Sequence, residues 1–462
     1  MNSFPHIDLS LLKRYNQPGP RYTSYPTAPL FTKDFGPKEF EAEIRRTNSP
    51  ENTRDISLYF HIPFCDTLCY FCGCTMMVTH ERPKIAEYLR VLKKEIEKIA
   101  AQVNPHRKAS QLHWGGGTPT YLNPDEILDF GFSIQKKFLY DSKIEASCEI
   151  DPRGLTREHL QALKDVGFNR LSMGVQDFNE TVQKAVNRIQ PESITRQVVD
   201  WSRELDFKSI NLDLIYGLPF QTLSGFEKTI DQIIKISPDR LAVFNYAHVP
   251  WLKKHMSLIQ EKDLPSPDQK LEILKMTIEK LCAAGYEYIG MDHFAKPEDE
   301  LAIAQKNKTL YRNFQGYSTK AGSDVYALGM SGISQFQEIY AQNAKTLPDY
   351  YRAIEAGHLA TQVGYRLNRD DQIRRKVITQ LMCHFELEES LLEEEFKIVF
   401  EEYFADSLKK LEGFIQEGLL VRENRRWKVK DLGKLFIRNI AMVFDAYLET
   451  MKKEKPVFSK TV

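Results

Sequence analysis

Hydrophobic and polar residues alternate in a series of short segments that begins near residue 56. In the first segment, 56–62, the polar side chains of Ser57, Tyr59 and His61 share one face and the apolar residues share the other. This period of two is typical of a β-strand with one polar face. Similar segments give five further predicted strands: 110–114, 143–150, 169–175, 209–215 and 240–247.

Helical patterns lie between these predicted strands. After the first strand, apolar residues recur at spacings of three and four, at positions 85, 89, 92, 96 and 99, which predicts a helix that packs against a core. The other helical patterns fall near 124–138, 156–166, 178–206 and 222–236. Strands that alternate with helices favour a parallel sheet. Six such units with right-handed crossovers predict an α/β protein with an incomplete (β/α)6 barrel rather than a closed eight-stranded one.

The rest of the chain divides around this barrel. We predict an N-terminal extension at 1–50, the barrel at 51–284, a flanking connecting region at 285–365, and a mostly helical domain at 366–462. The segment 15–26 holds three prolines and three tyrosines, which exclude a helix interior. It is either an extended linker or a segment that covers a pocket, where Arg21 would pair with a carboxylate of a bound molecule.

The C-terminal region combines helices with a hairpin. Apolar stripes predict helices at 370–385, 391–404, 407–417 and 431–449, and 418–430 predicts a hairpin that turns at Glu423 and Asn424. This arrangement is winged-helix-like. Four basic residues of the hairpin, Arg425, Arg426, Lys428 and Lys430, could touch phosphate, but a solvated face is the interpretation that the balanced overall charge favours.

Composition narrows the class of protein. Of the 462 residues, 42% are hydrophobic and 27% charged, with 63 basic and 63 acidic residues, so net charge gives no argument for a nucleic-acid partner. No apolar run is long enough to span a bilayer, and the first six residues lack the pattern of a signal peptide. Seven cysteines, four of them bunched, do not form a disulfide framework, and we expect a reducing cytoplasm.

The bunched cysteines carry the clearest chemical signal. Cys65, Cys69 and Cys72 have the spacing C-x3-C-x2-C, close enough for one loop to wrap a compact metal centre. A structural zinc site normally takes a second Cys or His pair at a distance, and none is evident. Iron–sulfur ligation is therefore favoured over zinc. Three thiolates on a four-iron cube leave one iron open for a ligand.

The other suggestive residues follow the ends of the predicted strands. The glycine-rich run 115–119, Glu149, Gln176, Asp213 and Ala247 each lie at or just after a strand. In barrel enzymes the carboxyl ends of the strands build the site. Each residue alone is weak evidence, since a carboxylate at such a position is often a helix cap, but their shared edge predicts one site.

These motifs resemble a known family. The C-x3-C-x-aromatic-C loop is similar to that of the radical S-adenosylmethionine (SAM) superfamily, in which the open iron takes the amino and carboxylate groups of the cofactor's methionine end. Five further motifs, at 18–26, 115–119, 173–177, 211–219 and 329–334, together with 291–295, resemble the oxygen-independent coproporphyrinogen III oxidases, also called coproporphyrinogen dehydrogenases. The resemblance runs nearly from end to end.

The resemblance implies a role for each motif residue. Cys65, Cys69 and Cys72 would hold a 4Fe–4S cluster, and Cys74 matches an extra cysteine that is not a ligand. Two adjacent SAM molecules are implied. The residues around the molecule that chelates the cluster would be Tyr59, Gly116, Glu149 and Ile333. Those around the second would be Phe71, Gly117, Thr118, Gln176, Arg188, Asp213 and Ala247. We predict Cys74 and Arg21 as catalytic residues.

The implied reaction is an oxidative decarboxylation without oxygen. The reduced cluster would cleave SAM to methionine and a 5′-deoxyadenosyl radical, which takes a hydrogen from a substrate propionate. Loss of carbon dioxide and one electron leaves a vinyl group, and two propionates of coproporphyrinogen III react to give protoporphyrinogen IX in haem biosynthesis. The family implies a monomer and an electron donor such as flavodoxin or ferredoxin.

Three alternatives stay open at this point. A haem chaperone of the same superfamily would bind and deliver haem, but such relatives generally lack the fourth cysteine and the Pro-Gly-Pro-Arg-Tyr segment, both present here. A radical SAM methyltransferase would yield S-adenosylhomocysteine. A zinc-dependent nucleic-acid-binding protein would contain zinc without iron or sulfide.

Overall fold

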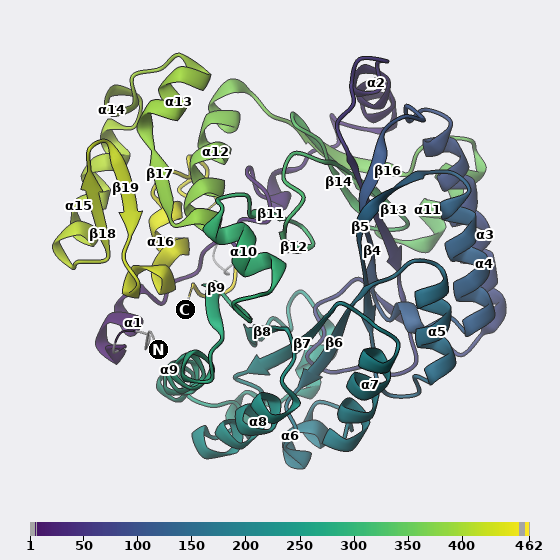
Figure 1. Cartoon of the computed structure of the whole chain (residues 1–462), viewed down its shortest axis with the longest axis horizontal. Helices are drawn as coiled ribbons and strands as arrows, with labels where there is room; N and C mark the ends of the chain where they lie inside the picture. Colours follow the sequence, from purple (N-terminus) through teal and green to yellow (C-terminus); the bar gives the residue numbers. More distant parts are fainter. Residues whose placement is uncertain (1–4, 6, 452–457, 462) are drawn as a thin grey trace.

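Six parallel strands form the centre of the computed structural model, which describes residues 5, 7–451 and 458–461 (Figure 1). They are hydrogen-bonded in chain order: β1 (Ile56–Ile62), β4 (Lys108–Gly116), β5 (Leu139–Ile150), β6 (Arg170–Gln176), β7 (Ser209–Tyr216) and β8 (Arg240–Asn245). All six match predicted strands. The incomplete parallel barrel is therefore confirmed.

Helices cover the outer face of these strands, as Figure 1 shows. They are α3 (Arg82–Ala100), α4 (Pro124–Gln135), α5 (Arg157–Asp165), α6 (Glu180–Ala185), α7 (Glu192–Glu204) and α8 (Leu223–Ile236), followed by α9 (Pro267–Ala283). The prediction of one helical segment over 178–206 was wrong. Helix α6 ends at Ala185, and Pro191 is the N-cap of α7. A continuous helix cannot run through Pro191, because proline lacks the N–H that a helix interior needs.

The core lies between the strands and these helices. The Trp114 ring of β4 packs 4.9 Å from the Phe130 ring of α4 and 4.9 Å from Phe168, measured between centroids. The side chains at the alternate positions of these strands face away from the helices. Register places Tyr59 beside His113 and Gly174 beside Asp213. The polar positions that alternate in the sequence therefore line the inside of the barrel.

The sheet continues beyond both ends of the predicted barrel. On one side β13 (Asp324–Leu328) pairs in parallel with β1, and β14 (Ile333–Gln335), β15 (Ile339–Asn343) and β16 (Thr361–Arg366) follow in antiparallel order. On the other side β10 (His293–Ala295) and β9 (Glu287–Gly290) pair next to β8. Strands from 51–284 and 285–365 thus share one twelve-stranded sheet, and the division between those two regions stays a prediction.

Smaller elements complete the barrel region. The pair β2 (Phe64–Cys65) and β3 (Met77–Val78) brackets the cysteine loop. The hairpin of β11 (Tyr311–Asn313) and β12 (Gly316–Ser318), the helix α10 (Glu300–Lys306) and the helix α11 (Leu347–Glu355) come from the connecting region. Short helical turns are η1 (Ala28–Leu30), η2 (Pro119–Tyr121), η3 (Lys254–Leu258) and η4 (Glu261–Asp263).

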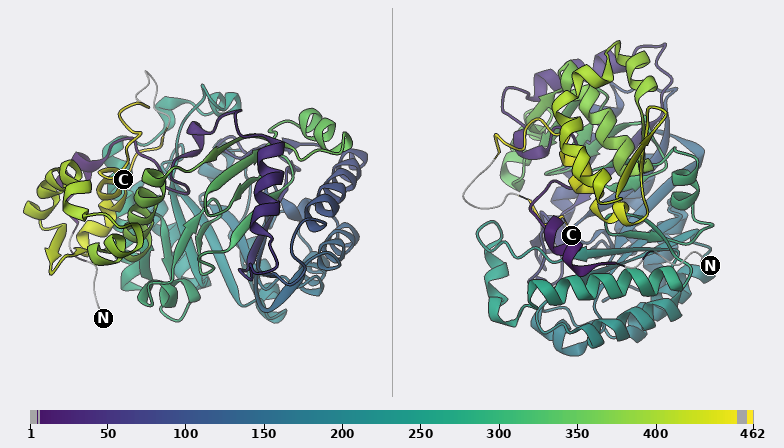
Figure 2. Two further views of the ribbon diagram at one scale, coloured as in Figure 1. Left: turned by 90° about the horizontal axis from the view of Figure 1, so that it is seen from above. Right: turned by 90° about the vertical axis from the view of Figure 1, so that its left-hand side faces the viewer.

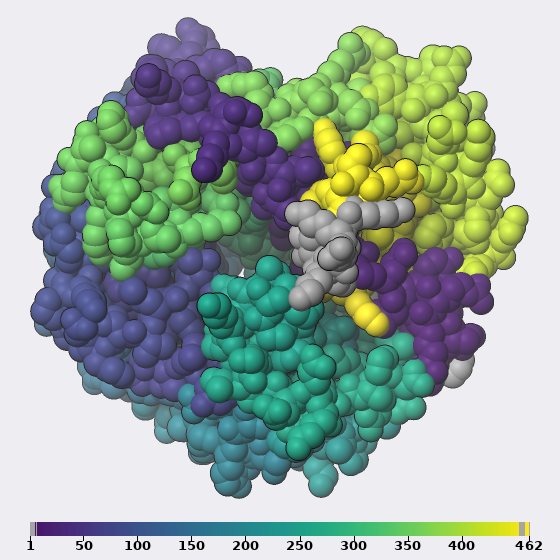
Figure 3. All heavy atoms as spheres, turned by 180° about the vertical axis from the view of Figure 1, so that it is seen from behind, coloured from purple at the N-terminus to yellow at the C-terminus, as the bar shows by residue number. Residues whose placement is uncertain are grey.

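The N-terminal segment crosses the molecule and is tied to the other end of the chain. It contains α1 (Leu9–Tyr15) and α2 (Pro37–Thr47). The buried guanidinium of Arg438 donates to the carbonyl oxygens of Pro20 (3.0 Å) and Lys460 (2.7 Å). Purple N-terminal and yellow C-terminal residues accordingly lie side by side in the right-hand view of Figure 2. Seen from behind, purple residues border a hollow in the surface (Figure 3).

The C-terminal region is mostly helical. Its helices are α12 (Arg369–His384), α13 (Glu389–Phe396), α14 (Phe400–Tyr403), α15 (Ala405–Gln416) and α16 (Ile437–Met442), the last preceded by η5 (Leu432–Phe436). A small sheet joins β17 (Glu386–Glu388), β19 (Arg426–Val429) and β18 (Leu420–Glu423). This combination confirms the winged-helix-like prediction.

Two details of that prediction were wrong. The hairpin turns one residue later than predicted, at Asn424 and Arg425, whose φ angles are 50° and 62°. No continuous helix runs over 431–449, because the chain forms η5 and α16 and leaves the helix after Met442. In this hairpin, Arg425 and Arg426 pair with glutamates at 2.6 and 2.5 Å. Within the described residues no helix is long and apolar enough to cross a membrane.

Candidate cluster and cofactor site

The cysteine loop follows β1, and its backbone is held by a segment from a later part of the chain. Cys69 is buried, Cys65 and Cys72 are half-buried, and Cys74 is exposed. The segment after β8 supports the loop: Lys253 Nζ donates to the carbonyl oxygen of Cys74 at 2.8 Å, and His255 Nε2 lies 2.8 Å from that of Cys72. The loop backbone is therefore fixed while its thiols point into a cavity.

That cavity, which we call the cluster-side cavity, has a volume of about 160 Å³. It brings together most of the residues predicted from the motifs. Those that line it are Cys65, Cys69, Cys72, Cys74, Phe71, Gly117, Thr118, Glu149, Gln176, Arg188 and Asp213. Apart from Arg188, which follows α6, they come from the loop after β1 and from the carboxyl-end part of β4, β5, β6 and β7, the shared edge that strand order predicted.

Hydrogen-bond donors surround the cysteine sulfurs. Thr118 Oγ1 lies 3.4 Å from the Sγ of Cys65. Arg153 Nη2 and Arg188 Nη1 lie 3.6 and 3.7 Å from the Sγ of Cys69. Asp151 accepts from both guanidinium groups, at 2.7 and 3.0 Å. Donors and cations next to cluster sulfurs favour the reduced state, so this arrangement would tune a bound cluster.

Sequence reasoning missed Asp151 and Arg153. Both follow the end of β5 directly after Glu149 and Ile150, and their place after a strand end was the available signal. The contacts with the two guanidinium groups also explain the charge state of Asp151. Burial alone would raise the pKa of Asp151, but Arg188 and Arg153 hold that pKa below its ordinary value.

A second space, the sheet-side cavity, has a volume of about 300 Å³ and lies over β1, β4, β13 and β14. Its lining includes Tyr59, Glu149 and Ile333, three of the four residues predicted around the SAM molecule that chelates the cluster. The Tyr59 ring stacks on His113 at 5.7 Å between centroids, and its hydroxyl lies 3.0 Å from Nδ1 of His61. Aromatic and imidazole rings thus form the wall on this side.

Glu149 belongs to both cavities. Its carboxylate accepts from the Gly116 N–H at 3.0 Å and lies 3.4 Å from Nε2 of His113. Burial alone would raise the pKa of Glu149, but these two contacts lower it below its ordinary value. An ionised acceptor therefore stands where the two spaces meet.

The pKa of Asp213 is shifted in the opposite direction to that of Glu149. Burial, followed by the charge of Glu149, raises the pKa of Asp213 to about 7, even though Asn211 Nδ2 donates to it at 2.7 Å. A carboxyl group with this pKa is partly protonated at neutral pH and can both donate and accept. Such a group suits ribose hydroxyls.

The cluster-side cavity also contains polar atoms that the protein does not satisfy. The buried Oε1 of Gln176 and Nε of Arg188 have no hydrogen-bond partner within the described part of the chain. Gln176 has a φ of 67°, a conformation that costs a non-glycine residue energy and is typical of functional sites. An amide and a guanidinium held in this way fit a ligand with hydroxyl and carboxylate groups.

The glycines at and directly after the end of β4 leave room that a side chain would take. A Cβ atom at Gly116 would lie 2.5 Å from the His61 ring, and one at Gly117 would lie 2.7 Å from the Pro63 backbone. Gly116 also has a φ of 118°, in the region that favours glycine. The thiols, the unsatisfied atoms and this glycine turn together fit a 4Fe–4S cluster and SAM.

Three predicted residues lie outside the linings of both cavities. Gly116 lines neither cavity, but its N–H donates to the carboxylate of Glu149, which lines both. Ala247 is exposed and follows β8. Arg21 forms an ion pair with Asp292 and lies 5.3 Å above the Phe244 ring, in a separate pocket of about 20 Å³. In the described residues, no three ligand side chains approach closely enough for a single metal ion, and the assignment of site residues stays a prediction.

Comparison with known proteins assigns two family models to the chain. The Radical SAM superfamily model matches residues 59–233, and the HemN C-terminal domain model matches 367–436. The first covers the barrel strands β1 to β7 with the cysteine loop. The second covers most of the C-terminal region.

Full-length relatives carry one description. The oxygen-independent coproporphyrinogen III oxidase of Synechocystis sp. is 45% identical over 100% of this chain and 99% of its own, and that of Escherichia coli K12 is 46% identical over 98% of each. The solved structure of coproporphyrinogen III oxidase (HemN) from Escherichia coli, a radical SAM enzyme, superposes with a TM-score of 0.91 at 46% identity. It covers 97% of this chain and 100% of that one.

Proposed function

The chain belongs to the oxygen-independent coproporphyrinogen III oxidase family of radical SAM oxidoreductases, and we propose how its cavities carry out that oxidation. It oxidises coproporphyrinogen III without oxygen. Two propionate side chains lose carbon dioxide and become vinyl groups, which gives protoporphyrinogen IX in haem biosynthesis. The full-length relatives support this function over that of a haem chaperone.

A 4Fe–4S cluster and SAM are the cofactors of this superfamily. When bound, they supply the one-electron chemistry that removes a hydrogen atom from the substrate. Cys65, Cys69 and Cys72 would hold three irons from the cluster-side cavity. The protein's own task is to orient the cofactor and to keep water and other hydrogen donors away from the reacting carbon.

The meeting of the two cavities at Glu149 supports a division of labour. A SAM molecule bound to the cluster by its amino acid end would extend past Glu149 toward Tyr59 and Ile333. A second SAM would use the unsatisfied atoms of Gln176 and Arg188, with the Asp213 carboxyl at its ribose. Phe71, Gly117 and Thr118 would pack around this second molecule.

Arg21 and Cys74 remain proposals for the catalytic step. Cys74 is exposed and lines the cluster-side cavity, so it can meet a bound molecule. Arg21 would have to leave Asp292 to bind a propionate. If the Arg21→Ala variant bound coproporphyrin III as tightly as the parent protein, that role for Arg21 would be excluded.

The proposal extends to partners. The cluster must be reduced from outside, and we infer a small one-electron donor such as flavodoxin or ferredoxin. We also propose that the protein acts as a monomer in the cytoplasm. The family resemblance supports these points, and the chain contains no membrane-spanning helix within its described residues.

The observation that carries the function is the cavity that gathers the three cysteines of the C-x3-C-x2-C motif with an unsatisfied amide and guanidinium. The test is an anaerobic assay of the reconstituted full chain with SAM, coproporphyrinogen III and a chemical reductant. We expect protoporphyrinogen IX and 5′-deoxyadenosine to appear together. S-Adenosylhomocysteine would indicate methyl transfer, and haem binding without product would indicate a chaperone.

A further inference from the structure

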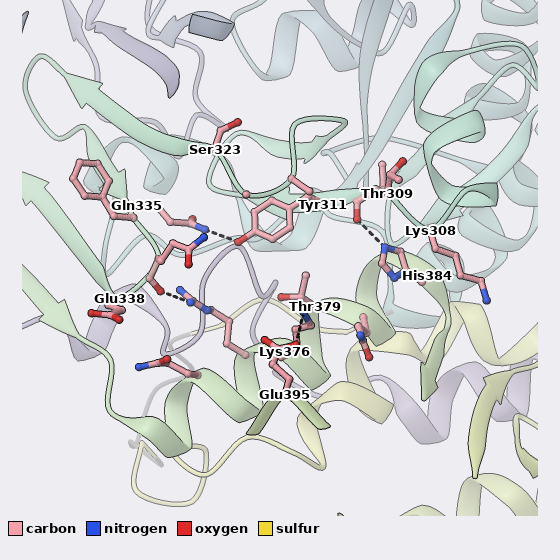
Figure 4. A pocket seen from close by; sticks show the side chains of 18 of the residues that line it. Lys308, Thr309, Tyr311, Ser323, Gln335, Glu338, Lys376, Thr379, His384 and Glu395 are labelled. Carbon is pink, nitrogen blue, oxygen red and sulfur yellow. Dashed lines mark hydrogen bonds and ion pairs between the residues drawn. The ribbon is translucent and has the colours of Figure 1, made fainter. Parts of the chain in front are cut away.

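A polar pocket of about 470 Å³, which we call the outer pocket, lies between the edge of the barrel and helix α12 (Figure 4). Its walls are the segments 308–311, 321–323 and 335–338, one face of α12, and residues 395–396. This volume is within the range of small-molecule sites. None of the predicted site residues lines it.

The outer pocket adjoins the sheet-side cavity through one residue. Gln335, at the end of β14, lines both spaces. Its Nε2 donates to the hydroxyl oxygen of Tyr311 at 2.8 Å, and Figure 4 shows this contact in the pocket wall. The Gln335–Tyr311 hydrogen bond thus separates the outer pocket from the space assigned to the cofactor.

Gln335 is buried with an unfilled hydrogen-bonding capacity. Its exposed fraction is 6%, and its Oε1 has no partner within the part of the chain that the structure describes. Whichever way the amide is turned, one of its polar atoms stays unpaired. The Oε1 of Gln380 on α12 is buried and unpaired in the same sense. Unpaired buried polar atoms of this kind indicate a ligand or water.

A guanidinium group supplies the charge. Arg375 of α12 donates to the carbonyl oxygen of Gln337 and forms no ion pair with a carboxylate among the described residues. The neighbouring cations differ: Lys376 pairs with Glu395 at 2.9 Å, and Lys308 pairs with Glu386. Arg375 is therefore the cation of this pocket that is available for the carboxylate of a ligand.

We propose that the outer pocket binds the ring of a carboxylated tetrapyrrole, with one propionate on Arg375. This inference rests on the proposed function. The inner cavities of about 160 and 300 Å³ are assigned to the cluster and SAM, so the ring needs further room. A second propionate would pass Gln335, with its bond to Tyr311 broken, and reach the sheet-side cavity.

The test measures binding separately from turnover. The probe is coproporphyrin III, an aromatic tetracarboxylate that does not react, titrated by fluorescence into the cluster-loaded full chain with SAM. We expect Arg375→Gln to weaken binding about tenfold or more and Arg375→Lys to restore part of the loss. Arg352→Gln is the matched control, because that exposed arginine of α11 pairs only with Asp349 of its own helix among the described residues.

Two further measurements make the result specific. Thr379→Trp puts a large side chain into the outer pocket and should also weaken binding, without depending on charge. Coproporphyrin III tetramethyl ester has no free carboxylate, so the parent protein should bind it weakly and Arg375→Gln should cause no additional loss.

Each outcome decides one point. Unchanged coproporphyrin III affinity in both Arg375→Gln and Thr379→Trp, with parent-level turnover, would overturn the outer-pocket site and leave the proposed function intact. A parent protein that neither binds the probe nor forms protoporphyrinogen IX would instead overturn the proposed function. Weaker binding in both variants, with SAM affinity and iron content unchanged, supports the site.

Discussion

The cluster-side and sheet-side cavities meet at Glu149, yet they use different chemistry. The first gathers thiols with two guanidinium groups and the carboxyl groups of Asp151 and Asp213. The second is built from rings, amides and the apolar side chain of Ile333. The lining of the cluster-side cavity is thus rich in charged groups, whereas that of the sheet-side cavity consists mainly of uncharged side chains. Changes to charged groups should therefore act mainly on one side, and changes at Glu149 should act on both.

The largest effect is expected from Cys69→Ser, which removes one of the three proposed thiolate ligands. We expect loss of the cluster and of all product formation, because a serine hydroxyl is a poor ligand for iron. Iron and sulfide analysis with visible absorption measures this loss. Cys282→Ser, at a half-buried cysteine outside both cavities, should keep its cluster. A full complement of iron in Cys69→Ser would contradict the ligand assignment.

Glu149→Gln should weaken SAM binding by about 10- to 100-fold. The change keeps the volume but removes a charged acceptor, and a hydrogen bond to a charged group contributes about 1.5–3 kcal/mol. Equilibrium dialysis of the cluster-loaded protein measures the affinity. Glu158→Gln, on the exposed start of α5, is the control. Equal affinities in parent and Glu149→Gln would show that the two cavities do not share this acceptor.

Arg153→Gln should make the cluster harder to reduce while leaving the sheet-side cavity unchanged. The guanidinium lies 3.6 Å from the Cys69 sulfur, and its positive charge favours the more negative, reduced cluster. At a fixed potential we expect the ratio of reduced to oxidised cluster to fall about tenfold, equivalent to about 59 mV. Redox titration followed by electron paramagnetic resonance measures the shift.

Arg157→Gln provides the matched control for that titration. Arg157 is an exposed arginine of α5 that pairs with Glu204 at 3.1 Å, away from the cysteine loop. Its substitution should leave the potential where it was. The same potential in Arg153→Gln and Arg157→Gln would remove Arg153 from the tuning of the cluster.

The smallest expected effect concerns Asp213 and pH. Its folded-state pKa of about 7 lies above its ordinary value of 3.8, so the folded protein binds more protons than the unfolded one between these values. Stability from this group is therefore present below about pH 4 and is lost as the pH rises through about 7.

Asp213→Asn should remove that dependence. Between pH 5 and pH 8, the melting temperature of the cluster-free parent should fall by about 2 °C more than that of the variant. Thermal unfolding in a pH series measures the difference. Parallel curves for the two proteins would show that the Asp213 carboxyl is not protonated in the folded state.

Regular alternation made the barrel predictable. The six central strands were found because each carries a run of alternating residues long enough to recognise, and the helices between them show apolar stripes. The strands β13 to β16 were not found. They are three to six residues long, and their pairing with β1 and with one another joins segments far apart in the sequence, which a local pattern does not encode.

The site was predictable to the extent that it follows strand ends. The cysteine loop, Glu149, Gln176 and Asp213 share an edge because parallel strands end together. Arg21 shows where this reasoning stops. Its partner Asp292 is 271 residues away, and the segment around Arg21 has no periodicity that places it on an edge. Only folding of the whole chain brings this pair together.

The contacts of Arg438 imply an order of events during synthesis. This side chain holds the backbone at Pro20 and at Lys460, so this three-way contact cannot form while either Arg438 or the residues near 460 are still inside the ribosome. The barrel strands, by contrast, emerge much earlier and already neighbour one another. The contact that joins the two ends of the described chain would therefore form only after nearly all described residues have left the ribosome.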